Sequence, residues 1–253
     1  MSGQRAFFAV SALLFAGSAV ATAAWCTSMT GGMPMPGGWT MSMAWMRMPG
    51  RAWPGAAASF LAMWIVMMMA MMLPSLVPAL WRYRQDVDTA GAASPGLLTA
   101  LAGAAYFFVW TIFGIAAFPV GVALATIEMQ QPALAHAVPI ATSVVVLMAG
   151  SLQFTTWKAR QLACCRDALE SESTVPAAWR HGLHLGVRCV HGCANLMAIL
   201  LVVGVMDVRA MAVVTTAITV ERLAPAGERA ARAIGAALVA AALIVIARTT
   251  ALA

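Results

Sequence analysis

Methionine is concentrated in one part of the chain, and its sulfur gives the first indication of chemistry. Of the 19 methionines in 253 residues, thirteen lie between Met29 and Met72. Seven of them fall in a Gly- and Pro-rich stretch: Met29, Met33, Met35, Met41, Met43, Met46 and Met48. A thioether is a soft, neutral ligand that prefers Cu(I) to hard cations. This pattern therefore favours the handling of a soft metal.

The Gly- and Pro-rich stretch has M-x-M and M-x-x-M spacings that suit capture of an ion. We take Met41, Met43, Met46 and Met48 as candidate ligands, and the indole faces of Trp39 and Trp45 could also lie against a bound cation. Methionine also fills irregular apolar gaps, so packing against a bundle is the alternative. An exposed loop has little core to fill, which favours Cu(I) capture.

Methionines recur at helical spacing in the apolar run that follows. Met63, Met67 and Met71 fall at i, i+4 and i+8 and so form one stripe, and Met68 and Met72 form an adjacent one. Packing alone can explain such a stripe on an apolar helix. Its position directly after the methionine-rich stretch makes Met63, Met67, Met71 and Met72 candidate ligands.

A later apolar run, His181 to Met197, carries two different faces. At about 100° per residue, Cys189, Cys193 and Met197 share one side of a helix. These side chains could supply two thiolates and a thioether to Cu(I), although free cysteine is also a small buried hydrophobe. The opposite side carries His184, Arg188, His191 and Asn195.

Ionisable groups inside apolar spans are costly and usually face a bundle interior or a water-filled cavity. His184 and Arg188 can lie near the inner interface, whereas His191 is deeper and is expected to have an interior role as a further candidate ligand. Glu221 either lies at an interface, pairs with Arg222, or pairs with a histidine or arginine of the preceding span. The vicinal Cys164 and Cys165 give only a weak signal for metal in transit.

The composition is that of an integral membrane protein. Hydrophobic residues make up 62% of the chain and charged residues 9%, against about 25% in soluble domains. Apolar runs of about 20 residues suffice to cross a bilayer. The sequence predicts an all-α, polytopic transmembrane helical bundle of about seven spans: Phe7–Trp25, Ala57–Leu80, Leu97–Thr126, Ala137–Trp157, Leu185–Met206, Ala210–Leu223 and Ala233–Ala251. The number falls to six if the first is a cleaved signal peptide or the short sixth does not cross.

The basic residues predict the orientation. With the N-terminus in the cytoplasm, 11 of the 15 Lys and Arg residues lie on the cytoplasmic side, as the positive-inside rule requires. The net charge of +6 therefore reports orientation in a bacterial inner membrane and does not indicate nucleic acid. Residues 1–25 form a first span or signal peptide, 26–56 an irregular extracytoplasmic loop, and 57–253 the multi-span domain. Lys158 belongs to a long inner loop in this arrangement.

Three segments resemble a bacterial family of predicted metal-binding integral membrane proteins, the domain of unknown function 2182, over about residues 59–227. The first is W-x-x-M-x-x-A-M-M-x-P, carried by Trp64, Met67, Ala70, Met71, Met72 and Pro74. The second matches at Cys189, Cys193, Leu196 and Met197, and the third at Glu221 and Pro225. Gly192 stands where the family has a further cysteine, Ala194 where it has tryptophan, and His191 where it has glycine. The resemblance implies metal handling, with one thiol fewer and a histidine as partial substitute.

These patterns predict a membrane protein that binds Cu(I) from the periplasmic side for delivery or transport. Its expected partners are the lipid bilayer and a copper-dependent membrane or periplasmic protein, and no nucleic acid. An assembly factor for a membrane enzyme, with no metal of its own, is the alternative. The sequence contains no Walker, G-x-S-x-G or H-E-x-x-H motif, and we do not expect an enzyme.

Overall fold

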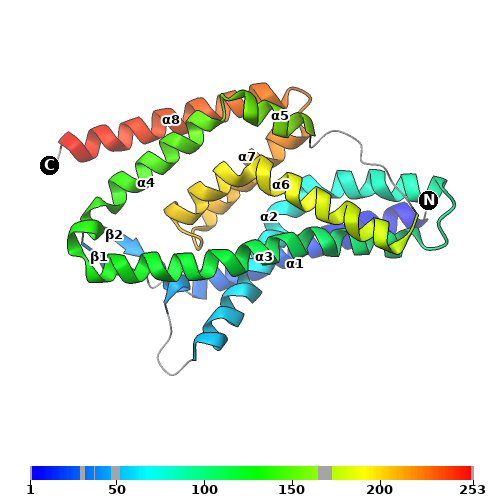
Figure 1. The fold of residues 1–253 in the computed structure, drawn as a ribbon, viewed down its shortest axis with the longest axis horizontal. Coiled ribbons are helices and arrows are strands. Elements are labelled where there is room, and N and C mark those ends of the chain that lie inside the picture. The colour runs from blue at the N-terminus through cyan, green and yellow to red at the C-terminus, as the bar shows by residue number, and fades with distance from the viewer. Residues whose placement is uncertain (1, 29–31, 37, 47–51, 165–172, 252–253) are drawn as a thin grey trace.

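The computed structural model describes residues 2–28, 32–36, 38–46, 52–164 and 173–251. In this part of the chain the structure is an all-α bundle with one small hairpin, which confirms the predicted fold class (Figure 1). The helices are α1 (Ser2–Ser28), α2 (Trp53–Thr89), α3 (Pro95–Gln130), α4 (Pro132–Leu152), α5 (Thr156–Cys164), α6 (Val175–Val203), α7 (Val208–Leu223) and α8 (Gly227–Ala251).

Six of these helices are long and apolar enough to cross a membrane: α1, α2, α3, α4, α6 and α8. The short span expected at Ala210–Leu223, the sixth in order, lies within α7, which has only 16 residues. That length is below the roughly 20 residues that a helix needs to cross the hydrocarbon core. Among the described helices, six rather than seven therefore have the length of a span.

Helices α2 and α6 form the centre of the bundle. About half of the most apolar window of each is buried, 56% in α2 and 50% in α6, against 11% in α1 and α3. Helix α3 packs along α6, α2 packs between α1 and α3, and α4 packs against α8 (Figure 1). Among the candidate spans described, α2 and α6 thus bury the largest share of their apolar residues.

Glycines on α6 allow its close approach to α3. A side chain at Gly182 would overlap the backbone of Ala102, and one at Gly186 would meet Val109 at 2.8 Å. Small residues permit this kind of backbone approach between helices. The α3–α6 contact brings α3 side chains next to the sulfur-bearing face of α6.

The proline residues of α2 do not end the helix. Pro74 and Pro78 both lie inside α2, which continues to Thr89. A proline in a helix interior removes one backbone hydrogen bond. The Ser75 hydroxyl donates to the Met72 carbonyl at 3.1 Å, next to the first of these prolines.

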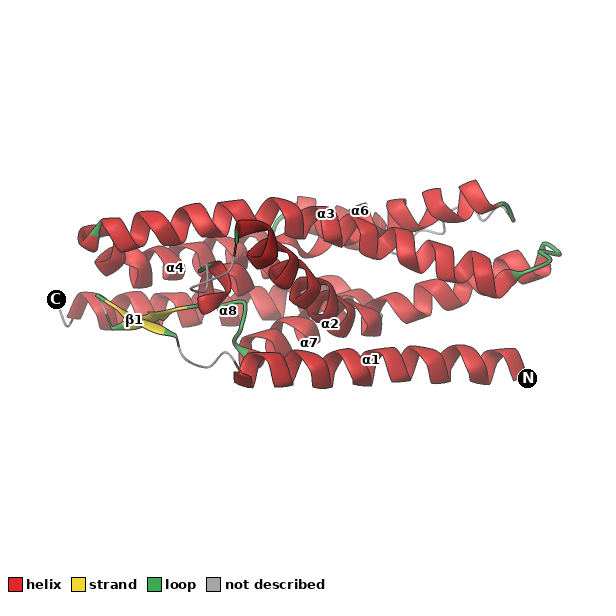
Figure 2. Cartoon of the chain, turned by 90° about the horizontal axis from the view of Figure 1, so that it is seen from below, coloured by secondary structure: helices red, strands yellow, loops and turns green. Residues whose placement is uncertain are grey.

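Residues 26–56 contain regular structure, and the expectation of an irregular loop was wrong. Strands β1 (Met33–Met35) and β2 (Trp39–Met41) form an antiparallel hairpin, and a 3-10 turn η1 (Met43–Trp45) follows (Figure 2). The Trp39 indole donates to the Ala135 carbonyl at 2.9 Å, where α4 begins. Trp39 thus anchors the described hairpin at the α3–α4 junction.

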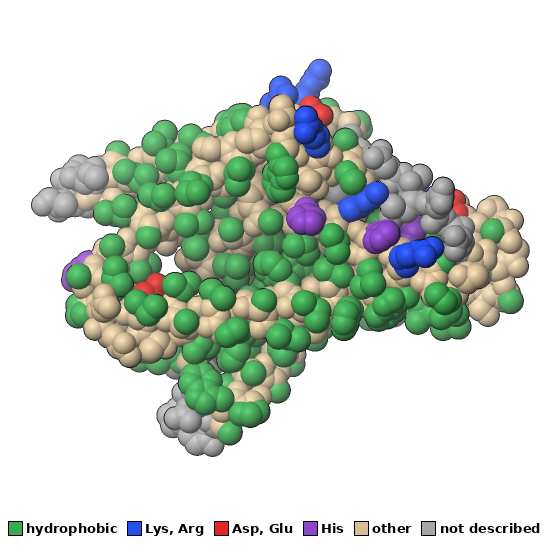
Figure 3. Space-filling view, in the orientation of Figure 1, with side chains coloured by type: hydrophobic (Ala, Val, Ile, Leu, Met, Phe, Trp, Pro, Cys, Tyr) green, Lys and Arg blue, Asp and Glu red, His purple; other side chains and the backbone are tan. Residues whose placement is uncertain are grey.

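Large hydrophobic side chains cover much of the surface. Leu13, Val213 and Met148 are each more than 60% exposed, and many others in α1, α3, α4 and α8 are open. In Figure 3 hydrophobic side chains cover most of the visible face, whereas Lys and Arg gather over α5, the start of α8 and the first half of α6. Exposed apolar surface of this extent marks an interaction surface.

Candidate metal centre

Two sulfur atoms meet where α2 and α6 face each other. The Cys189 Sγ lies 3.8 Å from the Met72 Sδ. Cys189 is 1% exposed and Met72 is completely buried. A thiol and a thioether from residues far apart in the sequence thus share one enclosed position, which we call the central sulfur pair.

Two hydrogen-bond donors converge on the Cys189 sulfur. The Tyr106 hydroxyl, from α3, donates to Sγ at 2.9 Å, and the Arg222 Nη1, from the last turn of α7, lies at the same distance. Arg222 Nη1 also contacts the Ser75 hydroxyl at 3.2 Å. A sulfur that receives a charged donor is stabilised as a thiolate, which is the metal-binding form of cysteine.

The remaining sulfur of α6 lies on the same inward face. Cys193 and Met197 follow Cys189 at successive turns, and both are at most 2% exposed. The prediction that Cys189, Cys193 and Met197 share one face of α6 is confirmed, and the structure shows that this face is buried. On α2, Met63, Met67, Met68 and Met71 are buried in the same hydrophobic cluster. Whether these side chains bind metal stays a prediction.

Most of the polar face of α6 points outward, although Asn195 is buried, and the interior role expected for His191 was wrong. His184 and His191 are exposed, and Arg188 is half-buried and donates to the Cys164 carbonyl at 3.0 Å. Two residues along a helix correspond to a turn of about 200°, so His191 must face away when Cys189 faces inward. His191 therefore faces away from the central sulfur pair.

Glu221 forms a buried ion pair that the sequence did not predict. Its carboxylate lies 2.7 Å from the Lys158 Nζ, and Gln153 Nε2 donates to it at 2.6 Å. The expected partners, Arg222 or a basic residue of α6, were wrong because the α4–α5 turn folds Lys158 into the bundle. Lys158 is completely buried and does not lie in an exposed loop.

Lys158 connects the ion pair to the helix that carries the cysteines. Its Nζ donates to the Gly192 carbonyl at 2.6 Å and lies 3.4 Å from the Asn195 Oδ1. Asn195 Nδ2 in turn donates to the Ala149 carbonyl at 3.1 Å. This ionic network joins α4, α5, α6 and α7. No sequence motif marks it, and only the position of a lone lysine just after an apolar run could have drawn attention to it.

The methionines of residues 26–56 have different surroundings. Met41 is 2% exposed and pairs with Met33 across the hairpin, and Met46 is half-buried. The side chain of Met43 and the whole of Met48 lie outside the described residues. The hairpin sits at the α3–α4 junction and not at the centre of the bundle (Figure 1).

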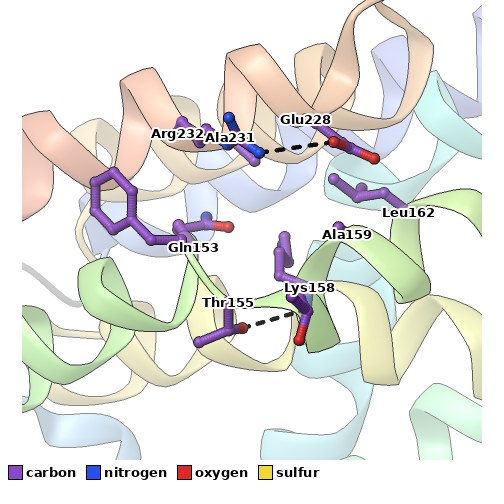
Figure 4. A pocket seen from close by; sticks show the side chains of 10 residues that line it. Gln153, Thr155, Lys158, Ala159, Leu162, Glu228, Ala231 and Arg232 are labelled. Atoms are coloured by element: carbon purple, nitrogen blue, oxygen red, sulfur yellow. Dashed lines mark hydrogen bonds and ion pairs between the residues drawn. The ribbon is translucent and has the colours of Figure 1, made fainter.

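A small pocket near the ionic network offers harder ligands. It has a volume of about 60 Å³, and Figure 4 shows Gln153 and Lys158 on one side and Glu228 and Arg232 on the other. No lining residue carries sulfur. Oxygen and nitrogen ligands suit water or hard cations, so this pocket does not have the chemistry of a Cu(I) site.

The central sulfur pair has the spacing that one metal ion needs. Bonds of about 2.3 Å to each sulfur would span 3.8 Å at an angle near 110°, the angle expected when further ligands are present. Cys193, one turn along α6, is placed to be such a ligand. Within the described residues no three His, Cys, Asp or Glu side chains form a metal-binding group, so a site here depends on methionine sulfur.

A family comparison supports this chemistry. Residues 61–245 match the model of PpoB2, described as a copper chaperone. The chain belongs to this copper chaperone family. Comparisons with curated proteins and with solved structures gave no match.

The family membership indicates a copper-handling role and bears out the copper-related part of the resemblance. The matched residues include the central sulfur pair, Cys193, Arg222 and the ionic network, whereas the methionine hairpin precedes them. The matched range therefore covers most of the bundle and its buried sulfur and does not cover the hairpin.

Proposed function

We propose that this protein is an integral membrane chaperone that holds Cu(I) at the central sulfur pair. Six helices of sufficient length and an extensively apolar surface support insertion in a bacterial inner membrane. The excess of basic residues on one side supports a cytoplasmic N-terminus. The protein binds and passes on the ion and does not act as an enzyme.

The observation that carries this proposal is the contact between the Met72 and Cys189 sulfurs inside a copper chaperone family chain. Thiolate and thioether are both ligands that select Cu(I). Cys193 supplies a second thiolate, and Met197 and the α2 methionines surround the ion with further soft sulfur. Because thioethers are neutral, they hold Cu(I) without adding charge, which suits an ion that must be released.

Charge favours a monovalent ion at this position. Thiolates at Cys189 and Cys193 carry two negative charges, and Arg222 and one Cu(I) carry two positive charges, so the loaded site is neutral. The neighbouring Lys158 and Glu221 already neutralise each other. A divalent ion in the same place would leave one uncompensated charge in the low-dielectric interior, which is costly.

Under this proposal the ion arrives from the periplasmic side. The methionine hairpin and the residues that follow it offer thioethers on that side. These are the thioethers of Met41, Met43, Met46 and Met48. A copper-dependent membrane or periplasmic protein receives the ion.

The test is copper retention by the purified protein in detergent. We expect the native chain, loaded with Cu(I) and challenged with a Cu(I) chelator, to keep copper that Cys189→Ser loses. Cys164→Ser is the matched control, because Cys164 is a half-buried cysteine of α5 outside the sulfur face of α6. Equal retention by Cys189→Ser and the control would rule out the central sulfur pair and leave the metal-free assembly factor as the better reading.

A further inference from the structure

A second cysteine–methionine pair lies far from the first. The Cys26 Sγ, in the last turn of α1, lies 3.9 Å from the Met206 Sδ, in the turn between α6 and α7. Cys26 is 4% exposed and Met206 is half-buried. The residues are 180 positions apart, so the fold and not the local sequence brings these two soft ligands together.

The turn that carries Met206 is well defined. Gly204 ends α6 with a φ of 138°, a conformation that side chains rarely adopt. Asp207 then caps α7 by accepting hydrogen bonds from the amides of Arg209 and Ala210 at 2.8 and 3.0 Å. Val205, which lies between Gly204 and Asp207, is completely buried. The Met206 thioether is thus held against α1 by a fixed turn.

Met206 lies in the turn that directly follows α6, the helix that carries Cys189 of the central sulfur pair. From Cys189 to the end of α6 at Val203 is a rise of about 21 Å. Cys193 and Met197 lie between, each one turn further along the buried face. Sulfur ligands on α6 thus extend from Cys189 through Cys193 to Met197, and a further rise of about 9 Å separates Met197 from the end of the helix.

Charge near the Cys26–Met206 pair also suits a cation. The exposed Asp207 carboxylate is close enough to interact electrostatically with Cys26. Arg209, two residues further, is exposed as well and partly offsets this charge toward solvent. A cation approaching this end of the bundle therefore meets the carboxylate of Asp207, the residue that follows Met206 in the sequence.

We propose that Cys26 and Met206 form the receiving site for Cu(I), from which the ion moves along α6 to the central sulfur pair. This inference rests on the proposed function. Binding replaces the Cys26 thiol proton, which leaves to water, with a Cu–S bond. Each later step forms one Cu–S bond as another breaks, and copper stays Cu(I) throughout. When the ion leaves Cys26, the thiolate takes up a proton again.

The experiment compares two double variants in detergent. Cys26→Ser with Met206→Leu removes both sulfurs of the receiving site. Cys164→Ser with Met148→Leu removes the same two residue types, and among the described residues neither makes a cysteine–methionine contact; Met148 is 61% exposed on α4. Loading starts from a Cu(I)–chelator complex, and both the rate of chelator release and the final copper content are recorded.

We expect the Cys26/Met206 variant to bind one ion fewer or to load at least about tenfold more slowly than the control. Residues that only hydrogen-bond to metal ligands already change metal affinity by about tenfold, so losing two ligands should have at least that effect. A rate and a copper content equal to those of the control would overturn the receiving site. The Cys189→Ser variant separates the two proposals. If it keeps an ion that the Cys26/Met206 variant loses, the receiving site stands although the central sulfur pair fails.

Discussion

Two buried polar centres lie on neighbouring sides of α6, and they differ in how charge is balanced. In the ionic network, Lys158 and Glu221 meet at 2.7 Å, and amide groups satisfy their remaining hydrogen bonds. In the central sulfur pair, a guanidinium faces a thiol and a thioether. The charges of the ionic network are balanced within the protein. The charges around the central sulfur pair would be balanced once two thiols ionise and one monovalent cation binds.

The comparison teaches that a buried ionisable group in the bundle is not by itself a sign of ligand binding. Burial is equal in the two centres, since Lys158 is completely enclosed and Cys189 is 1% exposed. Ligand type and charge balance separate them. We therefore expect changes in the ionic network to affect folding, and changes around the central sulfur pair to affect copper.

The largest expected effect follows from Glu221→Gln. This change leaves the Lys158 ammonium buried without its counter-charge, and breaking such a pair costs about 3–5 kcal/mol. The free energy of unfolding should fall by this amount in thermal or denaturant unfolding of the detergent-solubilised protein. Copper affinity of the folded fraction should change little.

The matched control is Glu228→Gln. Glu228 lies 3.9 Å from Arg232 in an exposed pair, and exposed pairs contribute at most about 1 kcal/mol. A Glu221→Gln variant as stable as Glu228→Gln would show that the ionic network does not stabilise the bundle. The double change Lys158→Met with Glu221→Leu should recover much of the lost stability, because it removes both charges together.

The second prediction concerns Arg222→Gln. Hydrogen bonds to charged groups contribute about 1.5–3 kcal/mol, so Cu(I) affinity should fall by this amount as the thiolate loses its cationic donor. The charge balance also changes, so the loss should be smaller for Zn(II) than for Cu(I). Chelator competition with both ions measures this.

Arg222→Lys serves as the conservative comparison, because it keeps the charge and loses the guanidinium geometry. It should retain more of the preference for Cu(I) than Arg222→Gln. Equal losses for Cu(I) and Zn(II) in Arg222→Gln would contradict selection by charge and return Arg222 to a purely structural role.

The sequence predicted features that depend on one helix at a time. The all-α fold follows from long apolar runs, and the shared sulfur face of α6 follows from the spacing of Cys189, Cys193 and Met197, although the spacing does not say that this face points inward. Helical periodicity fixes both without knowledge of neighbouring helices. The same periodicity, combined with the buried sulfur face, also explains why His191 points outward.

Features that depend on contacts between helices were missed. Arg222 reaches Cys189 from α7, and Cys26 meets Met206 across 180 residues. Lys158 was counted with a loop because a single basic residue after an apolar run is typical of an interface. Helix pairing decides these contacts, and no local pattern in one sequence encodes it. The position of the hairpin depends in the same way on a contact between distant segments, the hydrogen bond from Trp39 to the start of α4.

The smallest expected effect belongs to Tyr106→Phe, which removes one neutral donor from the central sulfur pair and keeps the ring. Tyr106 is completely buried and its hydroxyl donates to Cys189 at 2.9 Å. A hydrogen bond to a charged group contributes about 1.5–3 kcal/mol, and a neutral donor belongs at the lower end, so Cu(I) affinity should fall about tenfold, less than in Arg222→Gln. Chelator competition measures the difference. A loss larger than that in Arg222→Gln would mean that the hydroxyl itself binds the ion or orients Cys189, and charge would then not be the main distinction between the two buried centres.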